Sequence, residues 1–344
     1  MISYNTQILP TNTLQETACS LEIAAKALLN GELVGIPTET VYGLGANGMN
    51  EDAVAKIFAA KGRPQDNPLI LHISDMDMLQ MTAQDVSDIG NRLGERFWPG
   101  PLTMVFKRKS NVPSIVSAGL WTVAVRMPSH PVARELIQLC GFPIAAPSAN
   151  LSGTPSPTSA QHVFEDLNGK IPYIIDGGDC NIGLESTVIN LSSEIPIILR
   201  PGRITKDDIE EALGMSVKID PGITEYREYD GSVSSPGMKY RHYAPKANVK
   251  IFHGTTKEYV DYVNSRNDVY ALCFLEDTQW LNNPYLCYGG ADDFDTQGQK
   301  LFGALRKLDK LGAKTVIAHA PKKDGMGLSV YNRLIKSAGF EVVR

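Results

Sequence analysis

The chain has 344 residues, a formal net charge of −5 and a composition of 43% apolar and 21% charged residues. This length exceeds the usual size of one hydrophobic core, so we expect two domains. Because the composition has no basic excess, nucleic acid is not expected as the main ligand, although a local groove can still be positive. No apolar run approaches the roughly 20 residues that span a bilayer, so no membrane contact is expected.

The five cysteines lie far apart in the sequence and form no C-x-x-C pair, and no histidines neighbour them at the spacing of zinc ligands. A zinc site is therefore not expected. Their odd number and the lack of a secretory leader predict reduced thiols and a cytoplasmic protein.

Helices and strands alternate along the first part of the chain. A capping box of Thr13 and Glu16, followed by apolar residues at helical spacing, predicts the first helix. Another capping box, Thr158 with Gln161, predicts a second helix start, and Pro131 is typical of the first position of a third. Buried strands are expected at Leu33–Ile36, Leu69–Ile73, Leu102–Phe106, Val123–Met127, Ile144–Ala146, Tyr173–Ile175, Thr187–Leu191 and Ile197–Leu199.

The segment Pro221–Lys246 is rich in Gly, Pro, Ser and Tyr and has no apolar periodicity, which is typical of a linker. Beyond it, strand-like and helix-like segments alternate, which predicts a small α/β domain with mainly parallel strands. We therefore expect a first domain over 1–207, a linker over 208–246 and a second domain over 247–344. The expected elements of the second domain are strands at Val249–Phe252, Val269–Phe274 and Thr315–Ala318, and helices at Lys257–Asn264, Gln299–Leu311 and Leu328–Ala338.

The glycine-rich stretch Gly43–Gly48 fits G-x-G-x-x-G between a predicted strand and a helix, as a dinucleotide-binding fingerprint does. A Rossmann unit would place an acidic ribose ligand at the end of a second strand about 20 residues later. That position holds the turn Lys61–Pro68, so a dinucleotide cofactor is not favoured. The P-loop pattern and the protein-kinase motif set are absent as well.

Two cations flank the glycine of the segment Lys61-Gly62-Arg63. A compact ammonium and a rigid guanidinium fork suit the neutralisation of a polyphosphate. A helix C-cap with basic residues near its dipole end explains the same pattern, so both interpretations stay open. Ser148 and Asn150 follow a predicted buried strand, and they too fit either a ligand contact or a plain turn.

Several segments form one ordered set along the first domain: Pro37–Gly45, Lys61–Arg63, Asn67–Leu69, Phe97–Thr103, Val125–Pro128, Ser148–Asn150, Glu185–Val188 and Leu199–Gly202. Together they resemble the YrdC-type threonylcarbamoyl-adenylate synthase family, whose hallmark is the K-x-R and S-x-N pairs. Ser235–Met238, His242–Pro245 and Asn332–Leu334 resemble the linker and second domain of its longer members. The resemblance covers almost the whole chain.

The resemblance implies an α/β fold, with a twisted mixed-sheet YrdC-like domain that holds a concave basic groove, and a smaller Rossmann-like α/β domain. It implies a nucleotidyltransferase that condenses L-threonine, bicarbonate or CO2, and ATP into threonylcarbamoyl-AMP and pyrophosphate, with Mg2+ held by ligands that the resemblance does not specify. The product would pass to the downstream machinery that places threonylcarbamoyladenosine in tRNA. Such chemistry needs alignment and charge neutralisation and no protein nucleophile.

By resemblance, the two catalytic cations are Lys61 and Arg63. The ATP contacts fall on Lys61, Arg63, Asn67, Thr122, Ser148, Asn150, Ser156, Arg200 and Tyr243, and the threonine contacts fall on Thr40, His72, Arg126, Ala146 and Ser186. From the residues alone, Arg126 on a buried strand requires an anion. His72 alone fits a hydrogen-bonded core histidine as well as a ligand contact.

Two alternatives to a synthase remain at this point. A double-stranded RNA or tRNA-binding module could use the same basic groove, with salt-dependent association and no ATP turnover. A carbamoyl transferase of the hydrogenase-maturation type carries a related domain, but its partner domains include paired-cysteine zinc motifs that are absent here.

The segment Pro221–Lys246, with Tyr240, His242 and Tyr243, is interpreted as a lid over the groove, and a passive tether is the alternative.

Overall fold

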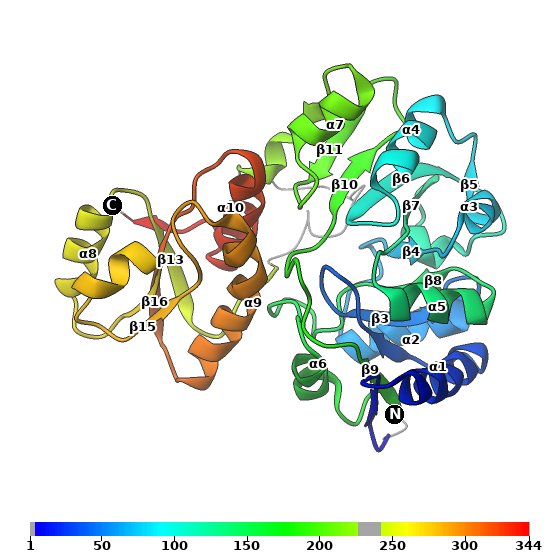
Figure 1. The fold of residues 1–344 in the computed structure, drawn as a ribbon, viewed down its shortest axis with the longest axis horizontal. Coiled ribbons are helices and arrows are strands. Elements are labelled where there is room, and N and C mark those ends of the chain that lie inside the picture. Colours follow the sequence, from blue (N-terminus) through cyan, green and yellow to red (C-terminus); the bar gives the residue numbers. More distant parts are fainter. Residues whose placement is uncertain (1–3, 226–241, 344) are drawn as a thin grey trace.

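The structure, a computed structural model, describes residues 4–225 and 242–343. It shows two α/β domains side by side, the first coloured blue to green and the second yellow to red (Figure 1). Part of the predicted lid, including Tyr240 and Ser235–Met238, lies outside the described residues. Among the described helices, none is long and apolar enough to cross a membrane.

One long mixed sheet forms the first domain. Its described strands are β1 (Gln7–Pro10), β2 (Val34–Ile36), β3 (Gly43–Asn47), β4 (Ile70–His72), β5 (Ala83–Gln84), β6 (Leu102–Arg108), β7 (Thr122–Arg126), β8 (Ile144–Ala145), β9 (Tyr173–Asp176), β10 (Thr187–Asn190), β11 (Ile197–Arg200) and β12 (Lys218–Ile219). They follow the order β1-β9-β2-β3-β8-β4-β7-β6-β10-β11-β12, with β5 paired to β6. Parallel pairs such as β4 with β7 and antiparallel pairs such as β6 with β7 confirm the predicted mixed sheet.

Side chains cap the described helices of the first domain, except the one that begins at Pro131. These helices are α1 (Leu14–Leu29), α2 (Glu51–Lys61), α3 (Met76–Thr82), α4 (Asp88–Phe97), α5 (Pro131–Cys140), α6 (Ala160–Leu167) and α7 (Lys206–Leu213). The predicted box of Thr13 and Glu16 caps α1. The predicted box at Thr158 is wrong, because Thr158 contacts the ring of His162 and Ser159 accepts the helix N–H that the cap requires.

The glycine-rich stretch forms strand β3 and leaves no room for a phosphate loop. A Cβ added to Gly45 would lie 2.3 Å from Cδ1 of Ile36, and one added to Gly48 would lie 2.7 Å from the carbonyl oxygen of Pro143. These glycines therefore permit close packing within the sheet. The dinucleotide fingerprint has no structural counterpart here.

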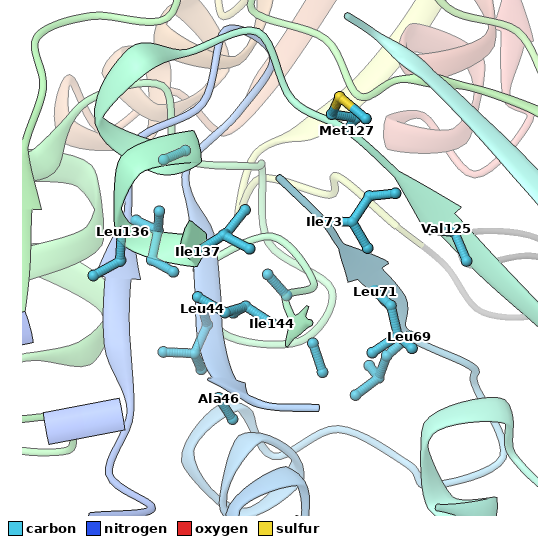
Figure 2. Packing of buried hydrophobic residues seen from close by; sticks show 14 of the residues in the cluster. Leu44, Ala46, Leu69, Leu71, Ile73, Val125, Met127, Leu136, Ile137 and Ile144 are labelled. Carbon is cyan, nitrogen blue, oxygen red and sulfur yellow. The ribbon is translucent and has the colours of Figure 1, made fainter. Parts of the chain in front are cut away.

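Alternation along β4 and β7 separates the main hydrophobic core from the opposite face of the sheet, where Ile70 and Ala124 belong to a smaller apolar cluster. Leu71 and Val125 join the main core, together with Leu136 of α5, and Figure 2 shows these side chains converging with those of neighbouring strands. Since successive strand residues point to opposite faces, His72 and Arg126 face the other side. The two lie beside each other in register across the parallel pair.

The second domain has a five-stranded parallel sheet in the order β15-β14-β16-β13-β17. Its elements are β13 (Asn248–Phe252), α8 (Thr256–Asn264), β14 (Tyr270–Cys273), β15 (Tyr285–Cys287), α9 (Phe294–Lys310), β16 (Thr315–His319), α10 (Gly325–Ser337) and β17 (Val342–Val343). The predicted small parallel α/β domain is confirmed. The short strands β15 and β17 were not predicted.

Residues 206–219, which the sequence assigns mostly to the linker, form α7 and β12. Ile209 and Leu213 of α7 belong to the main core of the first domain, and β12 extends its sheet beside β11. Helices α9 and α10 face the first domain (Figure 1). Val41 and Leu184 of the first domain join the core of the second, so the two domains share an apolar interface.

Candidate functional site

A pocket with about 610 Å³ of empty space, open solvent at its mouth included, lies between the first domain and the segment that holds His242 and Tyr243. Most of the predicted contact residues line it, namely Thr40, Arg63, His72, Arg126, Ala146, Ser148, Ser186, Arg200 and Tyr243. Of the other lining residues, His242 was predicted as part of the lid. The rest had no predicted role and are Thr38, Val41, Gly43, Ile70, Pro147 and Glu185.

Strand direction explains why the charged groups converge. His72, Arg126 and Arg200 are the last residues of β4, β7 and β11. The pairings along the sheet make these three strands run in the same direction. Their carboxyl ends therefore lie at one edge of the sheet, where open α/β sheets usually bind ligands.

Arg126 is only 4% exposed and already has an anion within the protein. Its Nη2 lies 2.7 Å from Oε1 of Glu39, its Nη1 donates to Oγ1 of Thr40 at 2.7 Å, and its Nε donates to the carbonyl of Gly100. Burial alone would raise the pKa of Glu39, but the charge of Arg126 lowers it overall, so Glu39 is ionised. Sequence reasoning missed Glu39, although it directly precedes Thr40.

His72 is a neutral imidazole at physiological pH. Burial, followed by the neighbouring charge of Arg126, lowers its pKa to about 3. Its Nδ1 is buried and has no hydrogen-bond partner among the described residues. His72 thus combines both interpretations from the sequence, since it is a buried histidine on a core strand and also lines the pocket.

Arg200 and Thr103 fix the orientation of Ser186. Arg200 donates from Nε to the carbonyl of Ser186 at 3.0 Å and from Nη2 to its hydroxyl at 3.1 Å. The hydroxyls of Thr103 and Ser186 lie 2.7 Å apart. A predicted threonine contact and a predicted ATP contact are therefore joined directly.

Lys61 is buried and does not line the pocket. Its Nζ donates to the carbonyls of Ser148 and Asn150, both at 2.5 Å, so it fastens the S-x-N loop. Burial, with the positive charge of Arg63, lowers its pKa well below the usual value. Gly62 has a φ of 61° and caps α2, so the C-cap interpretation is confirmed for that residue.

Arg63 is half-buried and its guanidinium lines the pocket. Its Nη2 donates to the carbonyls of Pro68 at 3.1 Å and Asn67 at 3.3 Å. The turn that follows the K-x-R motif therefore orients this side chain. Asn67 itself is buried outside the pocket lining.

Three other predicted ATP contacts lie outside the lining. Thr122 shares a face of β7 with Arg126 but stands four residues earlier, about 13 Å along the strand. The amide of Asn150 donates to the carbonyls of Leu151 and Thr154 within its own loop. Ser156 is fully buried and donates to Oε1 of Glu185 at 2.5 Å.

His242 and Tyr243, near the end of the predicted lid that leads into the second domain, line the pocket. The ring of Tyr243 lies 5.1 Å from that of Phe302 in α9. Burial, together with the charge of Glu185, raises the pKa of Tyr243 to about 12. Burial and a group of cations lower the pKa of His242 well below its usual value, and these cations are Arg63, Lys336, Lys61 and Arg200.

The described residues include no group of three or more His, Cys, Asp or Glu side chains that could hold a metal ion. The carboxylate of Glu185 is paired with Arg333 and that of Glu39 with Arg126. Neither acid offers a free carboxylate to a cation.

A family model described as Sua5_yciO_yrdC, telomere recombination, matches residues 26–202, and one described as the threonylcarbamoyl-AMP synthase C-terminal domain matches residues 204–339. The threonylcarbamoyl-AMP synthase of Pyrococcus abyssi is 44% identical over 94% of this chain and 95% of its own. That of Bacillus subtilis is 44% identical over 97% of each chain. The crystal structure of P. abyssi Sua5 complexed with L-threonine is 41% identical, with a TM-score of 0.89 over 98% of each chain. The chain therefore belongs to the Sua5/YciO/YrdC family, in the two-domain form that carries the synthase C-terminal domain.

Proposed function

We propose that this chain is a threonylcarbamoyl-AMP synthase, a nucleotidyltransferase that acts on ATP, L-threonine and bicarbonate or CO2. The observation that carries the proposal is the similarity over nearly the full length to two synthases of that name. The pocket supports it, because the guanidinium groups of Arg63, Arg126 and Arg200 line one cavity.

The reaction has two steps. The amine of threonine attacks CO2, forms a C–N bond and loses a proton, which gives a carbamate. A carbamate oxygen then attacks the α-phosphorus of ATP, and pyrophosphate leaves with the electron pair of the broken P–O bond. Since the substrate supplies its own nucleophile, the protein has to align the reactants and neutralise charge.

In this proposal Arg126 faces the threonine carboxylate, while Thr40 and Ser186 offer hydroxyl groups to the polar end of the amino acid. His72 donates or accepts a hydrogen bond as a neutral ring. With a pKa of about 3 it is too weak a base to take the proton of the amine. Because burial keeps the ring of His72 neutral, we assign His72 a positioning role.

We assign the phosphates of ATP to the side of the pocket with Arg63, Arg200 and the loop that Lys61 fastens. The guanidinium groups of Arg63 and Arg200 support this placement, because both residues line the pocket and a guanidinium suits phosphate oxygens. Mg2+ fits this site as a counter-ion that enters with ATP, since Mg2+ binds mainly through phosphates and water. When bound, it would neutralise further phosphate charge.

We place the reaction in the cytoplasm, upstream of the machinery that transfers the threonylcarbamoyl group to tRNA. The five cysteines are free thiols, which suits a reducing compartment. The proposal does not require that this chain binds tRNA itself.

Pyrophosphate release tests the proposal. The full chain is incubated with ATP and Mg2+, with and without threonine and bicarbonate in all four combinations, and serine serves as an alternative amino acid. We expect release only when threonine and bicarbonate are both present. Release that needs an amino acid but no bicarbonate would indicate simple aminoacyl adenylation and would contradict the proposal.

A further inference from the structure

Arg333 lies on α10 of the second domain and contacts Glu185, which lines the pocket. Its side chain is 0% exposed and nearly all of its donors are engaged. Nε donates to Oε2 of Glu185 at 2.9 Å, Nη2 to the backbone carbonyl of Glu185 at 3.1 Å, and Nη1 to the carbonyl of Pro201 at 2.5 Å. One guanidinium therefore binds two separate segments of the first domain.

Both segments continue directly into the predicted site. Glu185 lines the pocket, precedes Ser186 and accepts the hydroxyl of Ser156 on its other oxygen. Pro201 follows Arg200, which in turn donates to Ser186. Arg333 is thus one residue away from a predicted threonine contact and from a predicted ATP contact.

The chemistry of this contact requires a guanidinium. Burial alone would raise the pKa of Glu185, but the charge of Arg333, assisted by Arg200, lowers it overall, so the pair is ionic. A lysine could keep the charge but could not donate at once to a carboxylate and to two carbonyls in a planar fork. The loss of that fork would leave buried carbonyls without donors.

We infer that Arg333 is a positioning residue, through which the second domain holds Glu185, Ser156, Ser186 and Arg200 in the geometry that binds substrates. The inference rests on the proposed function for its kinetic test. Its binding test needs no turnover.

Other contacts between the domains hold them together without reaching a pocket residue. The hydroxyl of Ser329, one turn before Arg333 on α10, donates to the carbonyl of Gly202 at 2.8 Å. Lys310 pairs with Glu165 at 2.6 Å on the exposed surface. Ser329→Ala and Lys310→Ala are therefore matched controls, which weaken the interface but leave the Glu185 contact in place.

The first test is calorimetry of a non-hydrolysable ATP analogue and of L-threonine with the wild type, Arg333→Lys and the two controls. We expect Arg333→Lys to weaken one or both affinities by about tenfold and to lower kcat at saturating substrate, since small misplacements are costly in aligned sites. The controls should stay within about twofold of the wild type. Equal losses in Arg333→Lys and Ser329→Ala would indicate mere domain cohesion and would overturn the inference.

The second test is a double-mutant cycle between Arg333 and Glu185. If Arg333 acts through Glu185, then Arg333→Gln should add little to the loss that Glu185→Gln causes alone. The double variant removes both charges of the pair, so it also serves if the single variants do not fold. Fully additive losses in affinity would contradict the mechanism.

The two proposals fail in different ways. A wild-type chain that binds both ligands but makes no adenylate would contradict the proposed function and leave the binding test of Arg333 valid. A wild-type chain that makes adenylate, together with unchanged binding and kinetics in Arg333→Lys, would overturn only the inference about Arg333.

Discussion

Arg126 is paired with Glu39 before any substrate arrives. A buried guanidinium without an anion would be expensive, and this pairing keeps it ionised and oriented beside Thr40. A substrate carboxylate would therefore approach an arginine whose charge is already balanced. We expect this balance to set the affinity for the amino acid.

Replacing Glu39 by glutamine tests that balance. Because the variant leaves the charge of Arg126 buried and unpaired, the free energy of unfolding should fall by about 3 kcal/mol. Threonine, which brings a carboxylate, should then raise the melting temperature of Glu39→Gln more than that of the wild type. Thermal denaturation with and without threonine measures both effects. A smaller threonine-induced shift in the variant would contradict the assignment of Arg126 to the carboxylate.

His72 predicts a pH dependence of stability. Its pKa is about 3 in the folded chain and near 6.5 when unfolded, so the unfolded state binds more protons between these values. The stability associated with neutral His72 is complete above about pH 6.5 and is lost as the pH falls towards 3. Denaturant unfolding of the wild type and of His72→Gln across this range should show the steeper loss in the wild type. Parallel curves would mean that His72 titrates normally.

The candidate residues could be predicted only as far as the motifs reach. Resemblance named Arg126, His72 and Ser186, and the structure brings all three into one pocket. Glu39 and Glu185 stand inside the same motifs, but their roles depend on partners 87 and 148 positions away, which no local pattern reveals. The sequence around an acidic residue does not indicate which buried arginine will pair with it.

At the scale of elements, the start of a helix could be predicted where the sequence holds a complete capping pattern. The capping box at Thr13 marks the start of α1 because both of its reciprocal hydrogen bonds form. Strand β3 could not be predicted, since glycines disfavour strands and here serve contacts with distant residues such as Ile36. Short edge strands such as β15 and β17 carry too few residues for a period to show.

The S-x-N loop depends on Lys61 at the end of α2. The side chain of Lys61 donates to the carbonyls of Ser148 and Asn150, and its backbone carbonyl accepts from the N–H of Ser152. The loop that carries two predicted ATP contacts is therefore fastened to the K-x-R motif. The two hallmark motifs form one unit.

Lys61→Met tests this unit, since methionine keeps most of the length of the side chain and removes the donors to Ser148 and Asn150. We expect kcat/KM to fall at least about tenfold while the fold stays intact. Amide hydrogen exchange at Ser152 and its neighbours should become faster. Lys56→Met is the control, because Lys56 lies on the same helix and pairs with Glu32 at the surface. Unchanged exchange together with unchanged kinetics would remove Lys61 from the site.

At the scale of the whole molecule, the two domains share an apolar interface, so we expect them to fold as one unit. A chain that ends after Ile223 keeps α7 and β12 but exposes Val41 and Leu184 and removes the partner of Glu185. We expect it to lose about 3 kcal/mol or more of unfolding free energy from apolar exposure alone, and to bind nucleotide more weakly. Urea titration and calorimetry measure these effects. Full stability and full affinity in the shortened chain would show that the domains are independent.

The most direct test of the central claim is the mass of the nucleotide product. The full chain is incubated with ATP, Mg2+, L-threonine and either ordinary or 13C-labelled bicarbonate, and the product is isolated for mass spectrometry beside a measurement of pyrophosphate. We predict threonylcarbamoyl-AMP in equal amount to pyrophosphate, heavier by one mass unit when the bicarbonate is labelled. An adenylate whose mass ignores the label, or pyrophosphate without any adenylate that contains threonine, would contradict the account.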